Sequence, residues 1–256
     1  MNIRLDPKLA AGYSSPTQKI RVMSEAWAQQ EVFCAACGSP ILRAPNNQHV
    51  LDFRCSSCRE EYELKSKRDA FSRKVVDGAY RAMMQRLQAN QAPSFYFLAY
   101  DFSRWEVIDF FVVPGHFFLP GIIECRKPLK KPARRAGWIG CNIRLDQIPE
   151  SGRIHYIQNK RVIRPQRVRD AWGKTAFLKE SKDLKSRGWT LDVMQCVERL
   201  KKTEFSLKEV YDFEPELKQK YPNNNTVKDK IRQQLQILRG QNFIEFKGNG
   251  KYRRVE

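Results

Sequence analysis

The 256-residue sequence predicts an α+β protein in two parts, on three observations. Helical and strand patterns are mixed up to about residue 180, and the strand patterns are rich in aromatic and β-branched residues. Two Cys-x-x-Cys pairs interrupt this part. From residue 181, three amphipathic helical patterns lead into a hairpin pattern. We therefore expect a sheet-based domain with an inserted zinc module over residues 1–180, and a winged helix-turn-helix domain over residues 181–256.

The elements of the first part are predicted from the spacing of apolar residues. Residues 16–32 carry apolar side chains at helical spacing, which predicts an amphipathic helix ahead of the cysteines. Residues 47–54 and 60–67 alternate apolar and polar side chains, as half-buried strands do. A second helix and a buried pair of strands follow over residues 79–87, 94–102 and 105–113.

The second part is predicted to contain three short helices and a hairpin. The first helix covers residues 190–200, and the third runs from about residue 225 to Gly240. The second opens at Ser206, which forms a capping box with Glu209. It continues with apolar residues at Val210, Phe213 and Leu217. Residues 243–246 and 251–255 read as strands joined by an Asn-Gly turn.

The paired cysteines have the spacing of a four-thiolate zinc site: Cys34, Cys37, Cys55 and Cys58. Four thiolates leave no coordination position open, so we expect a structural Zn²⁺ ion that fixes the loop between the pairs. The alternative is a module that only stabilises the fold. The other cysteines are scattered singly, which fits a reducing cytoplasm, and we expect them to be buried thiols: Cys125, Cys141 and Cys196.

Lys and Arg number 47 against 28 Asp and Glu, a net charge of +19. Such an excess is typical of a protein that binds nucleic acid, although a basic protein without a polyanionic partner is the alternative. The hydrophobic content of 41% argues against disorder. No apolar stretch resembles a signal peptide or a membrane span, so we expect a cytoplasmic protein without a membrane partner.

Asp52, Glu63 and Lys65 are the candidate catalytic residues. Side chains alternate along a strand, so Glu63 and Lys65 project together while Tyr62 and Leu64 turn to the core. Paired strands would bring Asp52 to the same polar face. Two carboxylates that share a site bind Mg²⁺, which orients water and neutralises a phosphodiester, and a lysine stabilises the developing charge. The alternative is a solvated strand face.

A basic loop precedes a tryptophan flanked by glycines. The loop carries six basic residues and no acidic one: Arg126, Lys127, Lys130, Lys131, Arg134 and Arg135. Two prolines argue against a helix here. We expect the loop to hold a nucleic-acid backbone while Trp138 presents its ring to a base. The alternative is a solvated loop with a core tryptophan.

The third predicted helix of the second part has an outward face suited to the DNA major groove. Its apolar side chains lie on one stripe, so polar side chains near its N-terminus point to solvent. Glutamine, lysine and arginine there could bond to base edges, and the wing could contact the backbone. The predicted contacts are Thr226, Lys230, Arg232 and Gln233 in the helix, and Lys247 and Lys251 in the wing.

Together with the residues above, two longer motifs carry a family resemblance: residues 133–142 (Ala-Arg-Arg-Ala-Gly-Trp-Ile-Gly-Cys-Asn) and residues 230–239 (Lys-Ile-Arg-Gln-Gln-Leu-Gln-Ile-Leu-Arg). With these motifs, nearly the whole chain resembles the DpnI-like methyl-directed type II restriction endonucleases of the Dam-replacing protein family. The resemblance implies a PD-(D/E)xK nuclease domain fused to a winged helix. It also implies cleavage of duplex DNA at GATC sites that contain N6-methyladenine.

Residue by residue, the resemblance assigns the Mg²⁺ ligands to Asp52, Glu63 and the backbone carbonyl of Leu64, and the catalytic lysine to Lys65. It assigns Zn²⁺ to the four paired cysteines and places Trp138 near the methylated adenines. Leu51 stands where the named motif has proline, a departure that the loose pattern tolerates.

The methyl groups are predicted to be read twice. Burying one methyl group contributes about 0.8 kcal/mol, only a few-fold in affinity. A site methylated on both strands offers two methyl groups, so we expect both the Trp138 loop and the third helix to prefer methylated DNA. One catalytic set per chain predicts a monomer that makes two nicks in sequence, or that pairs transiently on DNA.

Two other functions fit the same residues. One is a non-enzymatic DNA-binding regulator made of a zinc ribbon and a winged helix. The other is an RNA-binding or RNA-processing factor, because basic charge and zinc modules also suit RNA.

Overall fold

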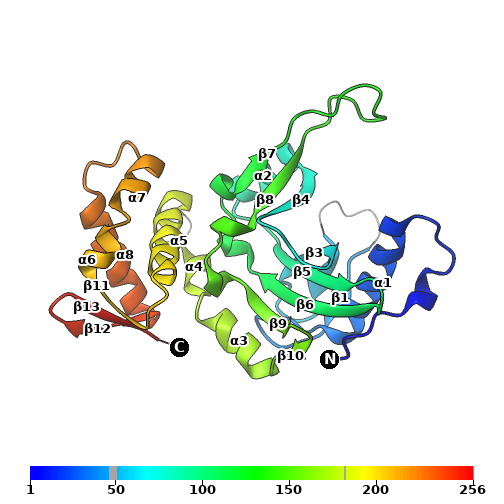
Figure 1. The fold of residues 1–256 in the computed structure, drawn as a ribbon, viewed down its shortest axis with the longest axis horizontal. Coiled ribbons are helices and arrows are strands. Elements are labelled where there is room, and N and C mark those ends of the chain that lie inside the picture. The colour runs from blue at the N-terminus through cyan, green and yellow to red at the C-terminus, as the bar shows by residue number, and fades with distance from the viewer. Residues whose placement is uncertain (46–50, 182, 256) are drawn as a thin grey trace. The chain divides into compact units, whose positions relative to one another are not determined.

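The computed structural model describes residues 1–45, 51–181 and 183–255 (Figure 1). By its internal contacts the chain forms two compact units. The first comprises Met1–Asp146 and Ser151–Gly173, and the second comprises Gln147–Glu150 and Lys174–Glu256. The contacts thus divide the chain slightly before residue 181, and the domain boundary given above stays a prediction.

The first unit is built on a mixed sheet with seven strands in the described residues. β3 and β5 run parallel, and all other neighbours in this sheet are antiparallel. In sheet order the strands are β1 (Ile41–Arg43), β2 (Phe53–Cys55), β3 (Glu61–Arg68), β5 (Ser94–Asp101), β6 (Glu106–Val113), β9 (Ile154–Gln158) and β10 (Arg161–Val162). The predicted pair at 94–102 and 105–113 is confirmed as the antiparallel, largely buried β5 and β6.

One face of this sheet packs against helix α1 (Pro16–Glu31), which confirms the predicted first helix. Pro16 occupies the first helical position and favours the start of the helix there. The N–H of a residue at this position has no acceptor within the helix, so proline, which has no N–H, loses no hydrogen bond. The indole of Trp27 meets the ring of Phe110 edge-on at 5.0 Å. The rings of Tyr62 and Tyr96 stack beside them at 4.4 Å. This aromatic layer is the core beneath the cysteine module.

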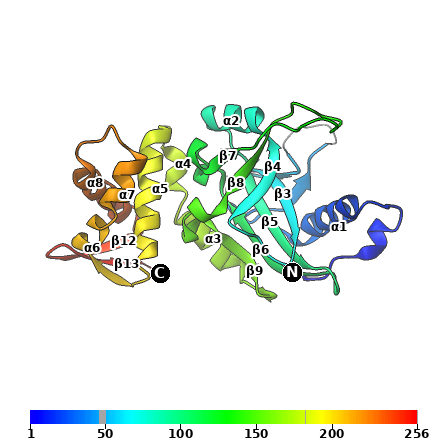
Figure 2. The same ribbon diagram turned by 45° about the horizontal axis from the view of Figure 1, so that its top comes forward.

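The opposite face carries a smaller, three-stranded sheet and helix α2 (Figure 2). The strands, in order, are β4 (Lys74–Ala79), β8 (Gly140–Arg144) and β7 (Ile123–Cys125), and α2 spans Tyr80–Gln88 as predicted. The connection between β7 and β8 is the basic loop, and it extends away from the rest of its unit (Figure 1). These three strands are too short or too irregular in pattern to be predicted from the sequence.

The strand predicted over residues 47–54 is corrected. β2 begins only at Phe53, Asp52 lies in the bend before it, and residues 46–50 lie outside the described residues. β2 pairs with β1, a strand that the sequence did not predict because it is three residues long. The strand predicted over residues 60–67 is confirmed as β3.

The second unit holds the predicted helices and hairpin. Its elements are α4 (Phe177–Glu180), α5 (Leu184–Arg199), β11 (Glu204–Ser206), α6 (Leu207–Tyr211), α7 (Glu214–Lys220), α8 (Val227–Gly240), β12 (Ile244–Gly248) and β13 (Lys251–Arg254). β11 joins the hairpin as a third strand beside β13, which completes the wing. The buried residues of α8 include Val227, Ile231, Leu235 and Leu238, the predicted apolar stripe.

The predicted second helix of this unit is two helices, α6 and α7. The capping box of Ser206 and Glu209 is present and opens α6. The helix then ends at Tyr211, because Pro215 has no N–H to bond to the Tyr211 carbonyl four residues earlier. Leu217, expected on the same helix as Val210, is therefore on α7.

The remaining elements are short, and two of them include residues of both units. They are α3 (Pro165–Gly173) and the 3₁₀ helices at Pro7–Ala10, Gly115–Phe117, Pro120–Ile122, Leu145–Gln147 and Glu150–Gly152. No helix within the described ranges is long and apolar enough to span a membrane. Among the single cysteines, Cys141 and Cys196 are buried as expected, but Cys125 is exposed because it ends β7 where the basic loop begins.

Candidate functional site

The four paired cysteines converge as the spacing predicts. Their sulfur atoms all lie within 4.8 Å of one another. The Cys34 and Cys58 sulfurs are 3.5 Å apart, and those of Cys37 and Cys55 are 3.4 Å apart. A tetrahedral Zn²⁺ with Zn–S bonds of about 2.3 Å needs sulfur separations of about 3.8 Å. The donor set therefore fits a structural zinc ion.

Both knuckles of the module turn through left-handed backbone. Gly38 has a φ of +83°, and its N–H donates to the Cys34 carbonyl at 2.8 Å. Arg59 has a φ of +62° just after the second pair, where the N–H of Cys55 donates to the Glu60 carbonyl at 2.8 Å. These turns aim the sulfurs of each pair at one point.

Tyr62 joins the cysteine module to strand β3. Its hydroxyl oxygen is 2.9 Å from the sulfur of Cys34, and its side chain is fully buried. Its carbonyl accepts the N–H of Asp52 at 3.0 Å. Glu63 is the next residue along β3. The module therefore fixes the strand and the bend that carry the predicted catalytic residues.

Asp52, Glu63 and Lys65 lie on one face, as predicted. Phe53 pairs with Tyr62 in the β2–β3 register, so Asp52 lies opposite Glu63. The N–H of Leu64 donates to Oδ2 of Asp52 at 2.7 Å. The Lys65 ammonium donates to Oε1 of Glu63. Only 13% of the Glu63 side chain and 18% of the Lys65 side chain are exposed.

Burial controls the charges in this group. It raises the pKa of Glu63 to about 7, against the attraction of Lys65. It also raises the pKa of Asp52, against the hydrogen bond from the Leu64 N–H. Burial lowers the pKa of Lys65, but the negative charges of Glu63 and Asp77 raise it by more, so the net pKa is above its ordinary value and the lysine stays protonated. Two carboxylates whose ionised forms are disfavoured by burial gain from a bound cation.

The carboxylates fit a hard divalent cation. Oε2 of Glu63 is buried and has no hydrogen-bond partner among the residues that the structure describes. An anionic oxygen without a donor is unfavourable in a protein interior unless a cation binds it. Carboxylate and carbonyl oxygens are the ligands that Mg²⁺ prefers.

Asp77 is a member of this group that the sequence did not point to. It lies on β4, and its Oδ1 is 2.5 Å from the Lys65 ammonium. Its Oδ2 accepts the thiol of Cys141 at 3.7 Å. Burial and Asp77 together raise the pKa of Cys141 to about 12, so the thiol remains a donor. A lone Asp in a short strand gives no signal in one sequence, because its partner is decided by sheet packing.

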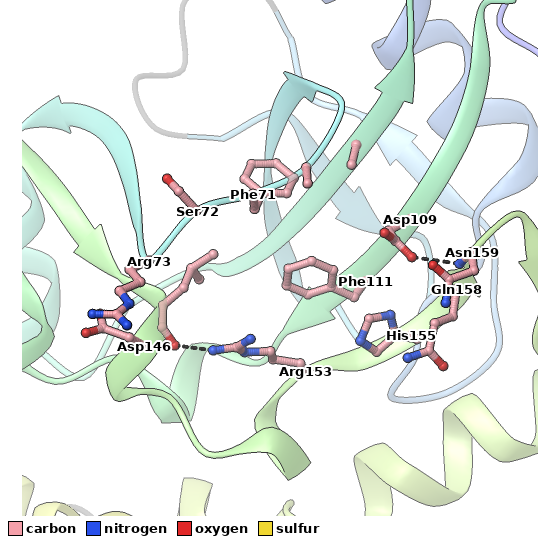
Figure 3. Close-up of a pocket in the computed structure, with 13 residues that line it drawn as sticks. Phe71, Ser72, Arg73, Asp109, Phe111, Asp146, Arg153, His155, Gln158 and Asn159 are labelled. Carbon is pink, nitrogen blue, oxygen red and sulfur yellow. Dashed lines mark hydrogen bonds between the residues drawn. The ribbon is translucent and has the colours of Figure 1, made fainter.

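A cavity of about 390 Å³ lies on the same face of the large sheet (Figure 3). Lys65, Phe97, Phe111 and His155 follow one another across the sheet by register, and the last two line the cavity. The ring of Phe71 meets that of Phe97 at 5.2 Å. The N–H of Asn159 donates to Asp109 Oδ1 at 2.8 Å and Arg153 donates to the Leu145 carbonyl at 2.5 Å, whereas Nδ1 of His155 is buried without a hydrogen-bond partner among the described residues. The predicted catalytic residues do not line this cavity.

The basic loop presents its cations to solvent. Lys130, Arg134 and Arg135 are exposed, and Arg126 is half-buried at the base of the loop. Trp138 is also half-buried: its ring lies over Gly140, where an added Cβ would be 2.8 Å from two ring carbons. Trp138 is thus neither a core residue nor free in solvent, and Gly140 leaves the space that its ring occupies.

The predicted face of α8 is accessible. Thr226, Arg232 and Gln233 are exposed and Lys230 is half-buried, with its ammonium donating to Gln233 Oε1 at 2.7 Å. Arg232 is held at one flank by the Tyr211 hydroxyl. Gln234 is fully buried and accepts the hydroxyl of Thr190 at 2.7 Å. In the wing, Lys251 is exposed and Lys247 pairs with Glu245 at 2.9 Å.

Comparison with protein families identifies the two parts. The model of the Dam-replacing (DpnI) family matches residues 1–181. The model of the Dam-replacing HTH domain matches residues 185–254. The chain belongs to the Dam-replacing family. The family is one of methyl-directed restriction endonucleases, and its helix-turn-helix domain implies DNA binding.

Membership in the Dam-replacing family confirms the predicted resemblance over nearly the whole chain. The α+β fold, the four-cysteine cluster and the C-terminal helix-turn-helix domain are also confirmed. The roles of individual side chains stay predictions.

Proposed function

We propose that this member of the Dam-replacing family hydrolyses duplex DNA at GATC sites containing N6-methyladenine, in a Mg²⁺-dependent reaction. One observation carries the chemistry: Asp52, Glu63 and Lys65 meet on one buried polar face, and Oε2 of Glu63 lacks a donor there. A PD-(D/E)xK nuclease core accords with β3 and β5, which run parallel and are connected through α2. The methylated substrate is inferred from membership in the family.

The side chains divide the reaction between them. Asp52, Glu63 and the carbonyl of Leu64 would hold Mg²⁺, which supplies Lewis acidity at the scissile phosphate and a water of lowered pKa. Lys65 remains protonated between two carboxylates and directs its N–H donors at the charge that develops on the phosphate. Cys34, Cys37, Cys55 and Cys58 would bind the structural Zn²⁺.

DNA contacts would come from both units. In the first unit, Arg126, Lys130, Arg134 and Arg135 hold the phosphate backbone and Trp138 offers its ring to the methylated base. In the second, Thr226, Lys230, Arg232 and Gln233 face base edges, and Lys247 and Lys251 contact phosphates. The protein acts in the cytoplasm as a monomer that nicks the two strands in turn, or pairs transiently on DNA.

A digest of matched methylated and unmethylated plasmids with Mg²⁺ tests this proposal. The methylated plasmid is expected to be cut and the unmethylated one to remain intact. Asp52→Ala or Lys65→Ala is expected to lower the rate at least about 100-fold, the scale of an electrostatic catalytic group. A non-enzymatic regulator would retard both plasmids and leave them intact, and an RNA factor would ignore duplex DNA.

Removing each metal separately tests whether Zn²⁺ has a structural role and Mg²⁺ a catalytic one. Omission of Mg²⁺ is expected to stop cleavage and to leave the thermal unfolding midpoint of the first unit unchanged within error. A zinc-selective chelator is expected to lower that midpoint, because metal binding and folding are coupled in four-cysteine modules. Loss of cleavage without a change in folding on zinc removal would contradict the structural role.

A further inference from the structure

We infer that Asp77 is a positioning residue that holds the ammonium of Lys65 in place when Glu63 binds the metal. This inference rests on the proposed nuclease function. It adds to the three predicted catalytic residues a fourth side chain, from a different sheet, that acts through Lys65.

The geometry ties Asp77 to Lys65 directly. The Lys65 ammonium is 2.5 Å from Oδ1 of Asp77, and only 3% of the Asp77 side chain is exposed. The same ammonium donates to Oε1 of Glu63. The lysine is therefore shared between two carboxylates that come from β3 and β4.

The register of β4 places a carboxylate where an apolar residue would be stabilising. Val75 pairs with Ile143 and Asp77 pairs with Cys141, so both side chains face inward. Val76, between them, is 62% exposed. A strand selected only for packing would bury the valine and expose the carboxylate, because an ionised group is costly to bury without a partner. The inward aspartate therefore indicates a role for its charge.

The two carboxylates around Lys65 differ in what else they reach. Glu63 lies opposite Asp52 and has a buried oxygen, Oε2, without a hydrogen-bond partner in the described ranges. Oδ1 of Asp77 is also buried without a hydrogen bond of good geometry in the described residues, but it forms the ion pair with Lys65, and Oδ2 accepts the Cys141 thiol. Within the described part of the chain, the four cysteines are the one group of three or more possible ligands whose atoms lie within 4.8 Å. Asp77 thus does not converge with Asp52 and Glu63 on a common point.

This arrangement assigns metal binding to Glu63 and the positioning of Lys65 to Asp77. A cation on Glu63 competes with Lys65 for the same carboxylate, and repels the ammonium. Asp77 remains beside Lys65 and keeps it next to the reacting phosphate. Without Asp77, the ammonium would lose its remaining carboxylate partner and keep only the weaker contact with the Phe95 ring, 5.7 Å from the ring centroid, among the contacts of the described residues.

Single-turnover cleavage of methylated GATC DNA by Asp77→Asn tests the inference in the full chain. The amide keeps the shape of the side chain and removes its charge. We expect the cleavage rate to fall about 10–100-fold, the usual effect of losing a supporting carboxylate. The Kd for DNA measured with Ca²⁺, and the Mg²⁺ concentration for half-maximal rate, are expected to remain unchanged. Rates are expressed per DNA-binding-competent molecule, so partial misfolding does not count as slow cleavage.

Two further variants make the test sharp. Asp77→Ser, which is smaller, is expected to show the same loss if Asp77→Asn does not fold. Glu106→Gln is the matched control, because Glu106 and Asp101 bind Lys160 in the same two-carboxylate arrangement, at 2.9 and 3.5 Å. Its cleavage rate is expected to equal that of the wild type.

The outcomes separate this inference from the proposed function. A wild-type protein that leaves methylated DNA intact would overturn the nuclease function, and the role of Asp77 with it. A wild type that cuts, with Asp77→Asn equally fast, would overturn only the positioning role. A tenfold rise in the Mg²⁺ requirement or in the Kd for DNA would also overturn it, by assigning Asp77 to the metal or to the DNA.

Discussion

At the scale of single residues, the site combines groups whose charges are unfavourable one by one. Glu63 is buried enough to raise the pKa of its carboxyl to about 7, and one of its oxygens has no donor in the described residues. Lys65 compensates part of this cost and is itself held between Glu63 and Asp77. Such a group is typical of a functional site, because stability alone would favour apolar side chains of similar volume.

Tyr62 is predicted to support the zinc ion. Its hydroxyl is 2.9 Å from the Cys34 sulfur, and its ring stacks on Tyr96. Tyr62→Phe keeps the stacked ring and removes the hydrogen bond. We expect zinc affinity to fall about 10–100-fold, as for other outer partners of metal ligands, measured by competition with a chromophoric chelator.

The control for this prediction is Tyr100→Phe, since the Tyr100 ring stacks on Trp105 and has no contact with the cysteines in the described structure. Its zinc affinity is expected to match that of the wild type. Equal zinc affinity of Tyr62→Phe and the wild type would show that the hydroxyl does not support the metal.

At the scale of elements, short-range chemistry determines where helices begin and end. Pro16 favours the start of α1, the capping box opens α6, and Pro215 separates α7 from it. Strands of three residues, such as β1 and β7, have no comparable local signal. They form because each pairs with a neighbouring strand, β2 and β8 respectively. The sequence therefore predicts the helices more completely than the strands.

The capping box of α6 is predicted to make stability depend on pH. Hydrogen bonds from Lys202 and Ser206 lower the pKa of Glu209 to about 2, below its ordinary value of 4.5. A lowered folded-state pKa contributes stability above the unfolded pKa, and this contribution is lost as pH falls toward the folded value. Glu209→Gln is expected to lower the unfolding midpoint of the second unit at pH 7. The difference from wild type should shrink below about pH 4.5.

Calorimetric unfolding of both proteins between pH 7 and pH 3 measures this difference. Glu204→Gln, an exposed change on the neighbouring β11, is the control and is expected to leave the midpoint unchanged. A difference that grows as pH falls would contradict the assigned sign.

At the scale of the whole molecule, a net charge of +19 and two compact units suit a protein that contacts one polyanion from two surfaces. Phosphate contacts set affinity, whereas contacts to base edges and methyl groups set specificity. We predict that the exposed arginines of the basic loop make contacts of the first class, and that Trp138 and Gln233 make contacts of the second.

Two methyl readers are predicted to multiply their discrimination. Trp138→Ala and Gln233→Ala are each expected to lower the ratio of Kd for unmethylated to Kd for methylated DNA. The expected effect of each is about fourfold, the value of one buried methyl group. The double variant should lose the product of the two effects. Binding titrations of the full chain with Ca²⁺ in place of Mg²⁺ measure these ratios.

Lys251→Ala is the control for this experiment. Loss of a phosphate contact in the wing is expected to weaken binding to both DNAs equally. It should also reduce the slope of log K against log salt concentration by about 1. If either Trp138→Ala or Gln233→Ala left the ratio unchanged, methyl reading would belong to the other unit alone.

The sequence by itself determined the features whose signals lie within a few residues. Cysteine spacing predicted the four-cysteine cluster, apolar periodicity predicted α1 and α8, and alternation along β3 put Glu63 and Lys65 on one side. The tertiary structure decided the rest. It exposed Cys125 at the end of β7 and brought Asp77 from β4 to Lys65. Contacts of this last kind join residues of different sheets, so packing between sheets decides them and no local pattern can record them.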